Sequence, residues 1–234
     1  MNYNIEENSN NRDFNWSILL IISLGSIVMG TYRDGFGALF PFLQEEFELS
    51  RTQIGLYTSF LYFASSFVSI VSGQLVDLNG SKKSMIYGIL IVAIALFLHS
   101  IVPNFMSAMV LATLAGIGMS INAPAANKSI TECFHQKLWS TATGIWSTAF
   151  PIGGLLAASF LPFLGILFGW RKAILFPGML ALFCVIMILI FYHDNRIKEN
   201  QFKRSEINLN YFLKGINLLI NNKELLAIAI YGFF

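Results

Sequence analysis

Two charged residues stand side by side inside an apolar segment near the start of the sequence, Arg33 and Asp34. An arginine can bind a carboxylate or phosphate through two parallel hydrogen bonds, because its guanidinium is planar and always charged. An aspartate that is partly withdrawn from water can exchange protons near physiological pH. The pair therefore has the chemistry of an anion anchor next to a proton carrier.

The position of this pair makes it expensive. Arg33 falls roughly 25 Å along a helix that starts at Trp16, still within a hydrocarbon core about 30 Å thick. At a helix centre, Arg or Asp costs about 2.5–3.5 kcal/mol, so such residues usually face a bundle interior or a water-filled cavity. One face of a continuous helix would hold Arg33 among small residues that leave room for it: Ser26, Gly30 and Gly37.

Adjacent residues on a helix point about 100° apart. We therefore expect Arg33 and Asp34 to find partners elsewhere rather than each other. The alternative is a purely structural role, in which the two charges neutralise each other or other helices and only fix the packing.

Composition points to lipid as the solvent. Of the 234 residues, 55% are hydrophobic and only 12% are charged, whereas soluble domains carry about 25% charged residues. A net charge of +2 offers no footprint for nucleic acid. Cys133 and Cys184 lack metal-ligand spacing, and no nucleophile–base pair or phosphate-cradling loop is evident. We expect no cofactor, no metal and no enzyme activity.

Six apolar segments approach the length of about 20 residues that a spanning helix needs. They cover residues 16–40, 54–76, 84–101, 105–127, 140–162 and 172–192. The predicted fold class is an all-α membrane protein with six transmembrane helices and the start of a seventh. Lysines and arginines concentrate in the segments that lie on the side of the N-terminus, which predicts a cytoplasmic N-terminus.

The domain organisation follows from these segments. Residues 1–15 are predicted to form a cytoplasmic tail, 16–192 the six-helix domain, and 193–224 a polar cytoplasmic loop. Residues 225–234 begin a further apolar run that is too short to cross, so we expect a truncated seventh helix and favour a fragment of a longer protein.

Further side chains could contact a ligand at membrane depth. Asn122 precedes Pro124, where a helix is loosened and its backbone groups open to a cavity. Tyr32, Tyr62 and Trp146 could stack on a ligand or bond to it, although aromatic residues in a bundle more often pack or anchor at the interface.

Two other sets of polar residues receive no binding role. His99 and His193 lie at span ends. Four residues are predicted to be solvated in a loop after the fourth span: Lys128, Glu132, His135 and Lys137.

The loop between the second and third spans, "GQLVDLNGSKKS", carries more information. Gly80, after Asn79, predicts a turn. Lys82 and Lys83 are charges that hold topology. Asp77 ends the second span, where a carboxylate opposes the helix dipole and needs a cationic or N-terminal partner.

This loop resembles the signature loop of the major facilitator superfamily, in which G-x-x-x-D is followed by x-x-G and basic residues. The matching residues are Gly73, Asp77, Gly80, Lys82 and Lys83, whereas Leu78 stands where a basic residue is usual. "GIWSTAFPIGG" in the fifth span is similar to the family's glycine–proline motif, with Phe150 in place of a glycine. "GWRKA" is similar to the start of its sixth helix.

The resemblance implies two six-helix halves, of which this chain is the first. Substrate would bind near the midplane between them, and access would alternate by rocking. In that family the signature aspartate locks the cytoplasmic side, so Asp77 would act as a gate together with the rest of the signature loop. Some organic-anion members carry an arginine next to an aspartate in the first helix, in the opposite order.

We therefore predict secondary transport of a small organic anion, a carboxylate or sugar acid, with proton coupling or exchange. Arg33 would anchor the anion and Asp34 would carry the proton. The expected partners are the substrate, protons, the lipid bilayer, and a C-terminal half in cis or a second half-unit. The expected location is the cell (inner or plasma) membrane. The alternatives are a non-transporting receptor or scaffold of the same fold, and an inactive truncated half-transporter.

Overall fold

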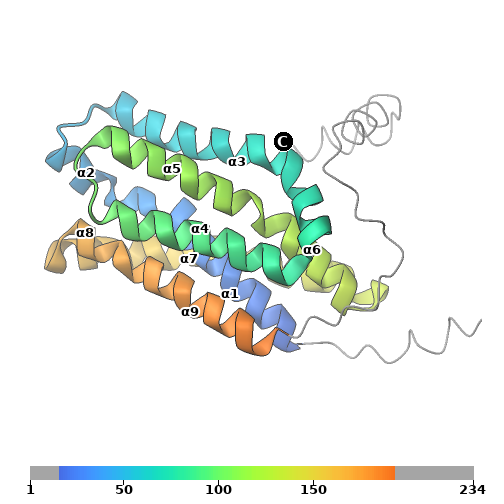
Figure 1. Cartoon of the computed structure of the whole chain (residues 1–234). Coiled ribbons are helices and arrows are strands. Elements are labelled where there is room, and N and C mark those ends of the chain that lie inside the picture. Colours follow the sequence, from blue (N-terminus) through green and yellow to red (C-terminus); the bar gives the residue numbers. More distant parts are fainter. Residues whose placement is uncertain (1–15, 193–234) are drawn as a thin grey trace, which may run out of the picture. The chain divides into compact units, whose positions relative to one another are not determined.

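The computed structural model describes residues 16–192, which lie in the first of two compact units, residues 1–195. The described part is a bundle of helices (Figure 1). Its elements are α1 (Trp16–Arg33), η1 (Phe36–Leu39), α2 (Phe40–Glu46), α3 (Arg51–Asn79), α4 (Ser81–His99), α5 (Phe105–Ser120), α6 (Asn122–Cys133), η2 (Gln136–Leu138), α7 (Trp139–Phe168), α8 (Trp170–Ala173) and α9 (Leu175–Phe191).

These elements form six helical segments that are long and apolar enough to cross a membrane, which confirms the predicted fold class. The cytoplasmic position of the N-terminus stays a prediction. The tail 1–15, the loop 193–224 with His193, and the apolar run 225–234 lie outside the described residues.

Polar capping residues extend α3 beyond its apolar run. Its first turn is closed by a capping box, in which the backbone N–H of Gln53 donates to Ser50 Oγ over 3.3 Å and that of Ser50 to Gln53 Oε1 over 2.8 Å. The helix ends before Gly80, whose φ of 82° is a conformation that glycine adopts without a steric penalty. The predicted turn therefore separates α3 from α4.

The fourth and fifth spans are longer than predicted. α5 and α6 together reach Cys133, so Lys128 and Glu132 lie on a helix rather than in the predicted loop. α7 continues through Pro151 and Pro162 to Phe168. In lipid there is no water to take over a released backbone group, so a proline is tolerated where neighbouring helices and local adjustments satisfy that group.

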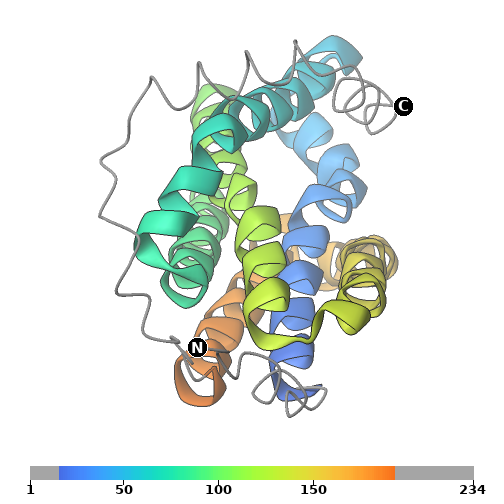
Figure 2. The ribbon, with the colours of Figure 1, turned by 90° about the vertical axis from the view of Figure 1, so that its right-hand side faces the viewer.

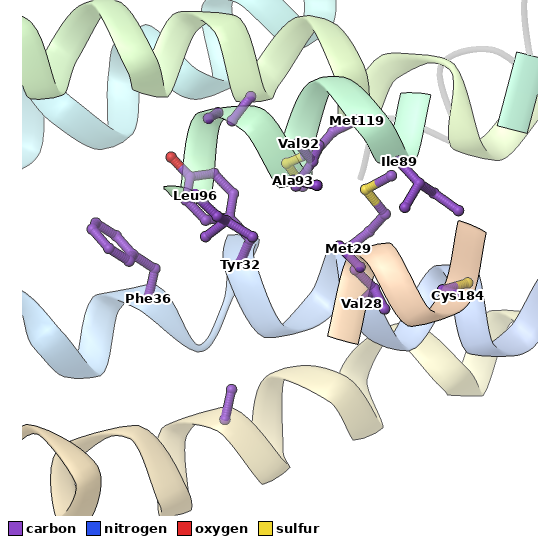
Figure 3. Close-up of a cluster of buried hydrophobic side chains, with 14 of the residues drawn as sticks. Val28, Met29, Tyr32, Phe36, Ile89, Val92, Ala93, Leu96, Met119 and Cys184 are labelled. Carbon is purple, nitrogen blue, oxygen red and sulfur yellow. The ribbon is translucent and has the colours of Figure 1, made fainter. Parts of the chain in front are cut away.

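The helices pack in a defined order. α1 lies between α7 and α9, α4 packs on α5 and α9, and α3 covers α5 (Figures 1 and 2). A cluster of buried apolar side chains lies between α1 and α4, and Met119 of α5 and Cys184 of α9 belong to it (Figure 3). Val28, Met29 and Leu96 are fully buried there.

A polar brace joins the spans at one end of the bundle. The guanidinium of Arg171 donates to Glu46 Oε1 over 2.5 Å and to the carbonyl oxygens of Ser100 and Val102 over 3.3 and 2.9 Å. The indole N–H of Trp170 also donates to Glu46. The "GWRKA" segment therefore ties the first, third and sixth spans together.

Candidate functional site at the break in the first span

The first span is interrupted at the predicted charges. Helix α1 ends at Arg33, the chain turns at residues 34 and 35, and η1 begins at Phe36. The backbone N–H groups of Asp34 and Gly35 both donate to the carbonyl oxygen of Gly30, over 3.0 and 3.3 Å. A Cβ on Gly35 would lie 2.1 Å from the Cβ of Ala157 in α7, so the chain passes α7 too closely for any other residue. The first span is therefore present, over residues 16–46, but the turn interrupts the helix that was expected to be continuous.

Arg33 and Asp34 form a direct pair, contrary to our expectation. Arg33 Nε lies 2.9 Å from Asp34 Oδ1, and Nη2 lies 3.2 Å from Oδ2. The expectation assumed that both residues were helical, whereas Asp34 lies beyond the helix end and can turn back to its neighbour. The two side chains are 37% and 35% exposed, so the pair is partly open to its surroundings.

Helix α7 forms the floor beneath this pair. Arg33 Cζ lies 4.0 Å from the ring centroid of Phe150, which is a favourable cation–π distance. A Cβ on Gly30 would lie 2.1 Å from the carbonyl oxygen of Phe150, and one on Gly154 would lie 2.6 Å from the Cβ of Asp34. These small residues let α1 and α7 approach closely, and that approach places the charges against α7.

A second polar cluster lies about two turns earlier on α1. Ser26 Oγ accepts hydrogen bonds from Asn122 Nδ2 over 3.1 Å and from Trp146 Nε1 over 2.6 Å. Two predicted ligand residues, from α6 and α7, are therefore brought together by a serine that the sequence placed only on a small-residue stripe. Ser26 and Asn122 are buried, and Asn122 Oδ1 has no hydrogen-bond partner among the described residues.

The two predicted tyrosines lie elsewhere. Tyr32 is fully buried, and its hydroxyl lies 2.8 Å from that of Tyr57 on α3. Tyr57 in turn lies 2.9 Å from His99 Nε2 on α4. Tyr62 is 43% exposed on α3. Sequence reasoning gave His99 no role, because a lone histidine at a span end carries no signal of the tyrosines that surround it.

The signature loop has a cationic partner at its aspartate. Lys128 Nζ lies 3.0 Å from Asp77 Oδ1 and 3.9 Å from Glu132 Oε1. The expectation that Lys128 is a solvated loop residue is wrong, because α6 extends far enough to carry it to the end of α3. Lys82 Nζ donates to the carbonyl oxygen of Leu189 over 3.3 Å.

Hydroxyl groups fasten the end of the sixth span beside that ion pair. Tyr192 donates to Ser129 Oγ over 2.9 Å, and its oxygen lies 2.9 Å from Ser81 Oγ. Ser81 also donates to Glu132 Oε2 over 3.0 Å.

Comparisons with known proteins agree with this architecture. A galacturonate transporter of Dickeya chrysanthemi is 26% identical over 202 residues, which cover 86% of this chain and 57% of that protein. A 4-hydroxybenzoate transporter of Pseudomonas aeruginosa is 23% identical over 180 residues, covering 75% and 39%. This chain thus spans about half the length of the relatives that it matches.

Solved structures show the same fold. A bacterial homologue of the human lysosomal transporter Spinster, in an inward-facing and unoccupied conformation, superposes with a TM-score of 0.67 at 18% identity, covering 88% of this chain and 50% of that one. The sequence model of the Major Facilitator Superfamily matches residues 22–234. The chain is therefore a multi-pass integral membrane protein that belongs to the major facilitator superfamily.

Proposed function

We propose that the protein carries a small organic anion, a carboxylate or sugar acid, across the membrane by alternating access with proton coupling or exchange. The observation that carries this proposal is the two-armed Arg33–Asp34 pair, about one third exposed at a helix break. A charge pair so costly at membrane depth is a functional-site hypothesis by default. The names of two relatives, transporters of galacturonate and of 4-hydroxybenzoate, add support, because both compounds are carboxylates attached to a ring.

The geometry suggests how coupling would work. The two oxygens of Asp34 engage the guanidinium of Arg33 through Nε and Nη2, as a substrate carboxylate would. Adding a proton to Asp34 removes its charge and frees these donors, so the site gains one positive charge and attracts an anion. Loss of the proton restores the internal pair and displaces the anion. In exchange, a second anion would replace the first while Asp34 stays neutral.

Uptake of labelled galacturonate by the reconstituted full-length protein tests the anchor. We expect Arg33→Ala to weaken apparent affinity by at least about tenfold, since a charge-assisted two-armed contact is worth more than about 1.4 kcal/mol. Arg33→Lys keeps the charge but loses the paired guanidinium donors, so its apparent affinity should lie between those of the wild type and of Arg33→Ala. Arg51→Ala, at the exposed start of α3, is the matched control. Unchanged affinity in Arg33→Ala removes the anchor assignment.

The proton role has its own test. Uptake by Asp34→Asn should no longer respond to a pH gradient, because an amide cannot carry the proton. Glu48→Gln, at an exposed carboxylate between α2 and α3, should keep the wild-type response. A pH-dependent Asp34→Asn protein would rule out Asp34 as the coupling group.

A charge-swapped variant separates transport from a packing role. Arg33→Asp/Asp34→Arg retains one charge of each sign at the helix break. If the pair only neutralises itself, this variant should keep both its stability and its uptake. If Arg33 is the anchor above Phe150, uptake should be lost, because the guanidinium moves to the other position. Impermeability of the wild-type protein to a broad panel of solutes would favour a receptor or scaffold.

The signature loop is the proposed gate. Asp77 and Lys128 pair at one end of the bundle, next to Gly73, Gly80 and Lys83 of the same loop. We infer that the remaining half of the transporter, in cis or as a second half-unit, meets this end. Locking would then consist of contacts between that half and the signature loop. The predicted cytoplasmic side of this gate rests on the lysine and arginine distribution.

A further inference from the structure

We propose that Tyr57 and His99 are positioning residues, which hold the Arg33–Asp34 pair in place from the opposite side of the first span. The inference rests on the proposed function of that pair. His99, Tyr57 and Tyr32 come from α4, α3 and α1, and each is 2% exposed or less. None of them touches the charges directly, so their effect would pass through the backbone of α1.

The hydrogen bonds between these residues have a fixed direction. His99 Nδ1 lies 2.8 Å from the carbonyl oxygen of Ala95, which can only accept, so in the neutral imidazole Nδ1 carries the proton and Nε2 is an acceptor. Tyr57 donates to Nε2 over 2.9 Å. The hydroxyl proton of Tyr57 is thereby used, and its oxygen accepts from Tyr32 over 2.8 Å. A buried chain in which every proton has a partner specifies one arrangement of its members.

The hydrogen-bonded chain of Tyr32, Tyr57 and His99 contacts residues on both sides of the helix break. Tyr32 immediately precedes Arg33, and Phe36 lies two positions after Asp34. The ring of Phe36 stacks on Tyr57, with centroids 5.3 Å apart and planes at 23°. Figure 3 shows Tyr32 and Phe36 side by side on their two elements, facing the α4 side of the core.

Phe36 also contacts His99 and Tyr32 through its ring. Its ring lies edge-on to His99, with centroids 5.5 Å apart, and 5.3 Å from the ring of Tyr32. The residues before and after the turn are therefore bound to the same pair on α3 and α4. Since that surface takes Tyr32 and Phe36, the two charged residues between them are left to face α7, where Phe150 and Gly154 receive them.

Amide hydrogen exchange tests, without any substrate, whether Tyr57 and His99 hold the helix break in place. In detergent-solubilised full-length protein, Tyr57→Phe and His99→Leu should raise the exchange rate of residues 31–40 several-fold and leave α9 unchanged. His99→Gln should restore protection, because its amide oxygen can accept from Tyr57. Tyr87→Phe, at an exposed tyrosine on α4, is the matched control. Unaltered exchange over residues 31–40 in both variants would overturn the proposal.

Uptake of labelled galacturonate tests the consequence for the site. Tyr57→Phe should raise KM about tenfold with little change in the maximal rate, because the anchor is displaced rather than removed. In an Arg33→Lys background the same substitution should have almost no further effect, since residues that act through one another are not additive. An equal loss in both backgrounds would make the role merely structural.

The two proposals fail in different ways. If the wild-type protein takes up no ring carboxylate, the proposed function fails, and the exchange measurement alone decides whether Tyr57 and His99 hold the break. If the wild-type protein is active and the variants keep its exchange rates and KM, the positioning role fails while the transport proposal stands.

Discussion

Glycines line the contact surface between α1 and α7, which we call the seam, and let the two helices approach closely. The glycines on the outer face of α3 lie in open space. A Cβ on Gly30 would lie 2.1 Å from a carbonyl oxygen of α7, and a Cβ on Gly153 would lie 2.1 Å from the carbonyl oxygen of Ile27. A Cβ on Gly55 or Gly73 would meet nothing within 4 Å among the described residues. Gly30 and Gly153 therefore pack against a neighbouring helix of the described bundle, whereas Gly55 and Gly73 leave space for one.

The open face of α3 also carries polar residues, which lie beside exposed apolar ones such as Phe63 and Phe67. Its exposed polar residues between the two glycines recur at intervals of three and four, as one helix face requires. They are Ser59, Tyr62, Ser66 and Ser69. Ser59 and Ser69 donate to carbonyl oxygens of their own helix, and small and polar residues are typical of helix–helix contacts in membranes. The open glycines and these hydroxyl groups leave room for a further helix against α3.

Forcing α1 and α7 apart with a larger side chain should have the largest effect. We expect Gly153→Leu to prevent close approach of α1 and α7 and to cost more than about 3 kcal/mol, because backbone on the facing helix cannot move aside. The measurement is the yield of monodisperse protein and its melting temperature in detergent. Gly144→Leu, on the same helix with open space around it, is the control. Equal melting temperatures would show that the seam is not tightly closed.

Removing a shared acceptor within the seam should have an intermediate effect. Ser26→Ala leaves the N–H donors of Asn122 and Trp146 without their partner, which costs about 1–3 kcal/mol for a buried group. Thermal unfolding gives the loss, and indole fluorescence reports the altered setting of Trp146. In Ser147→Ala the lost hydroxyl is exposed and bonds only to its own helix, so stability should barely change.

An ion pair at the end of the open helix should contribute little to stability. Lys128→Ala should lower the free energy of unfolding by no more than about 1 kcal/mol, because Asp77 is 75% exposed and water screens the pair. Chemical unfolding of this variant beside Lys83→Ala measures the difference. A loss several times larger would mean that the signature loop is a structural fastening and not a gate.

The smallest structural perturbation tests whether α3 is open. Ser66→Cys should react with a water-soluble thiol reagent in this chain, whereas Ser72→Cys, at a position only 1% exposed, should not. In a protein that also contains the proposed second half, labelling at position 66 should fall. Equal labelling of both cysteines in this chain would contradict the contrast between the two faces.

The sequence predicts the fold well, because the requirement for about 20 apolar residues per span leaves few alternatives. It predicts the ends of the spans less well, since these depend on local bonds such as that between Ser50 and Gln53. The break at Arg33 was not predictable from its neighbours. Gly35 is required there by Ala157, more than a hundred residues away, and no proline marks the position.

The candidate site shows the same limit. Arg33 and Asp34 stand out in the sequence because charge is expensive in lipid, so their importance can be argued before any contact is known. Ser26 and His99 do not stand out. The meaning of Ser26 depends on the indole of Trp146, and that of His99 on two tyrosines from other helices. Only the packing of distant segments creates these roles.

The polar fastenings at the two ends of the bundle have a mechanical consequence. Arg171 clamps Glu46 at one end, and Tyr192 is pinned between Ser81 and Ser129 at the other. Hydrogen bonds between helices at both ends of the bundle resist sliding and bending of the helices relative to one another. We therefore expect the helices between these two ends to move together as one rigid body. Any conformational change would then take place outside them.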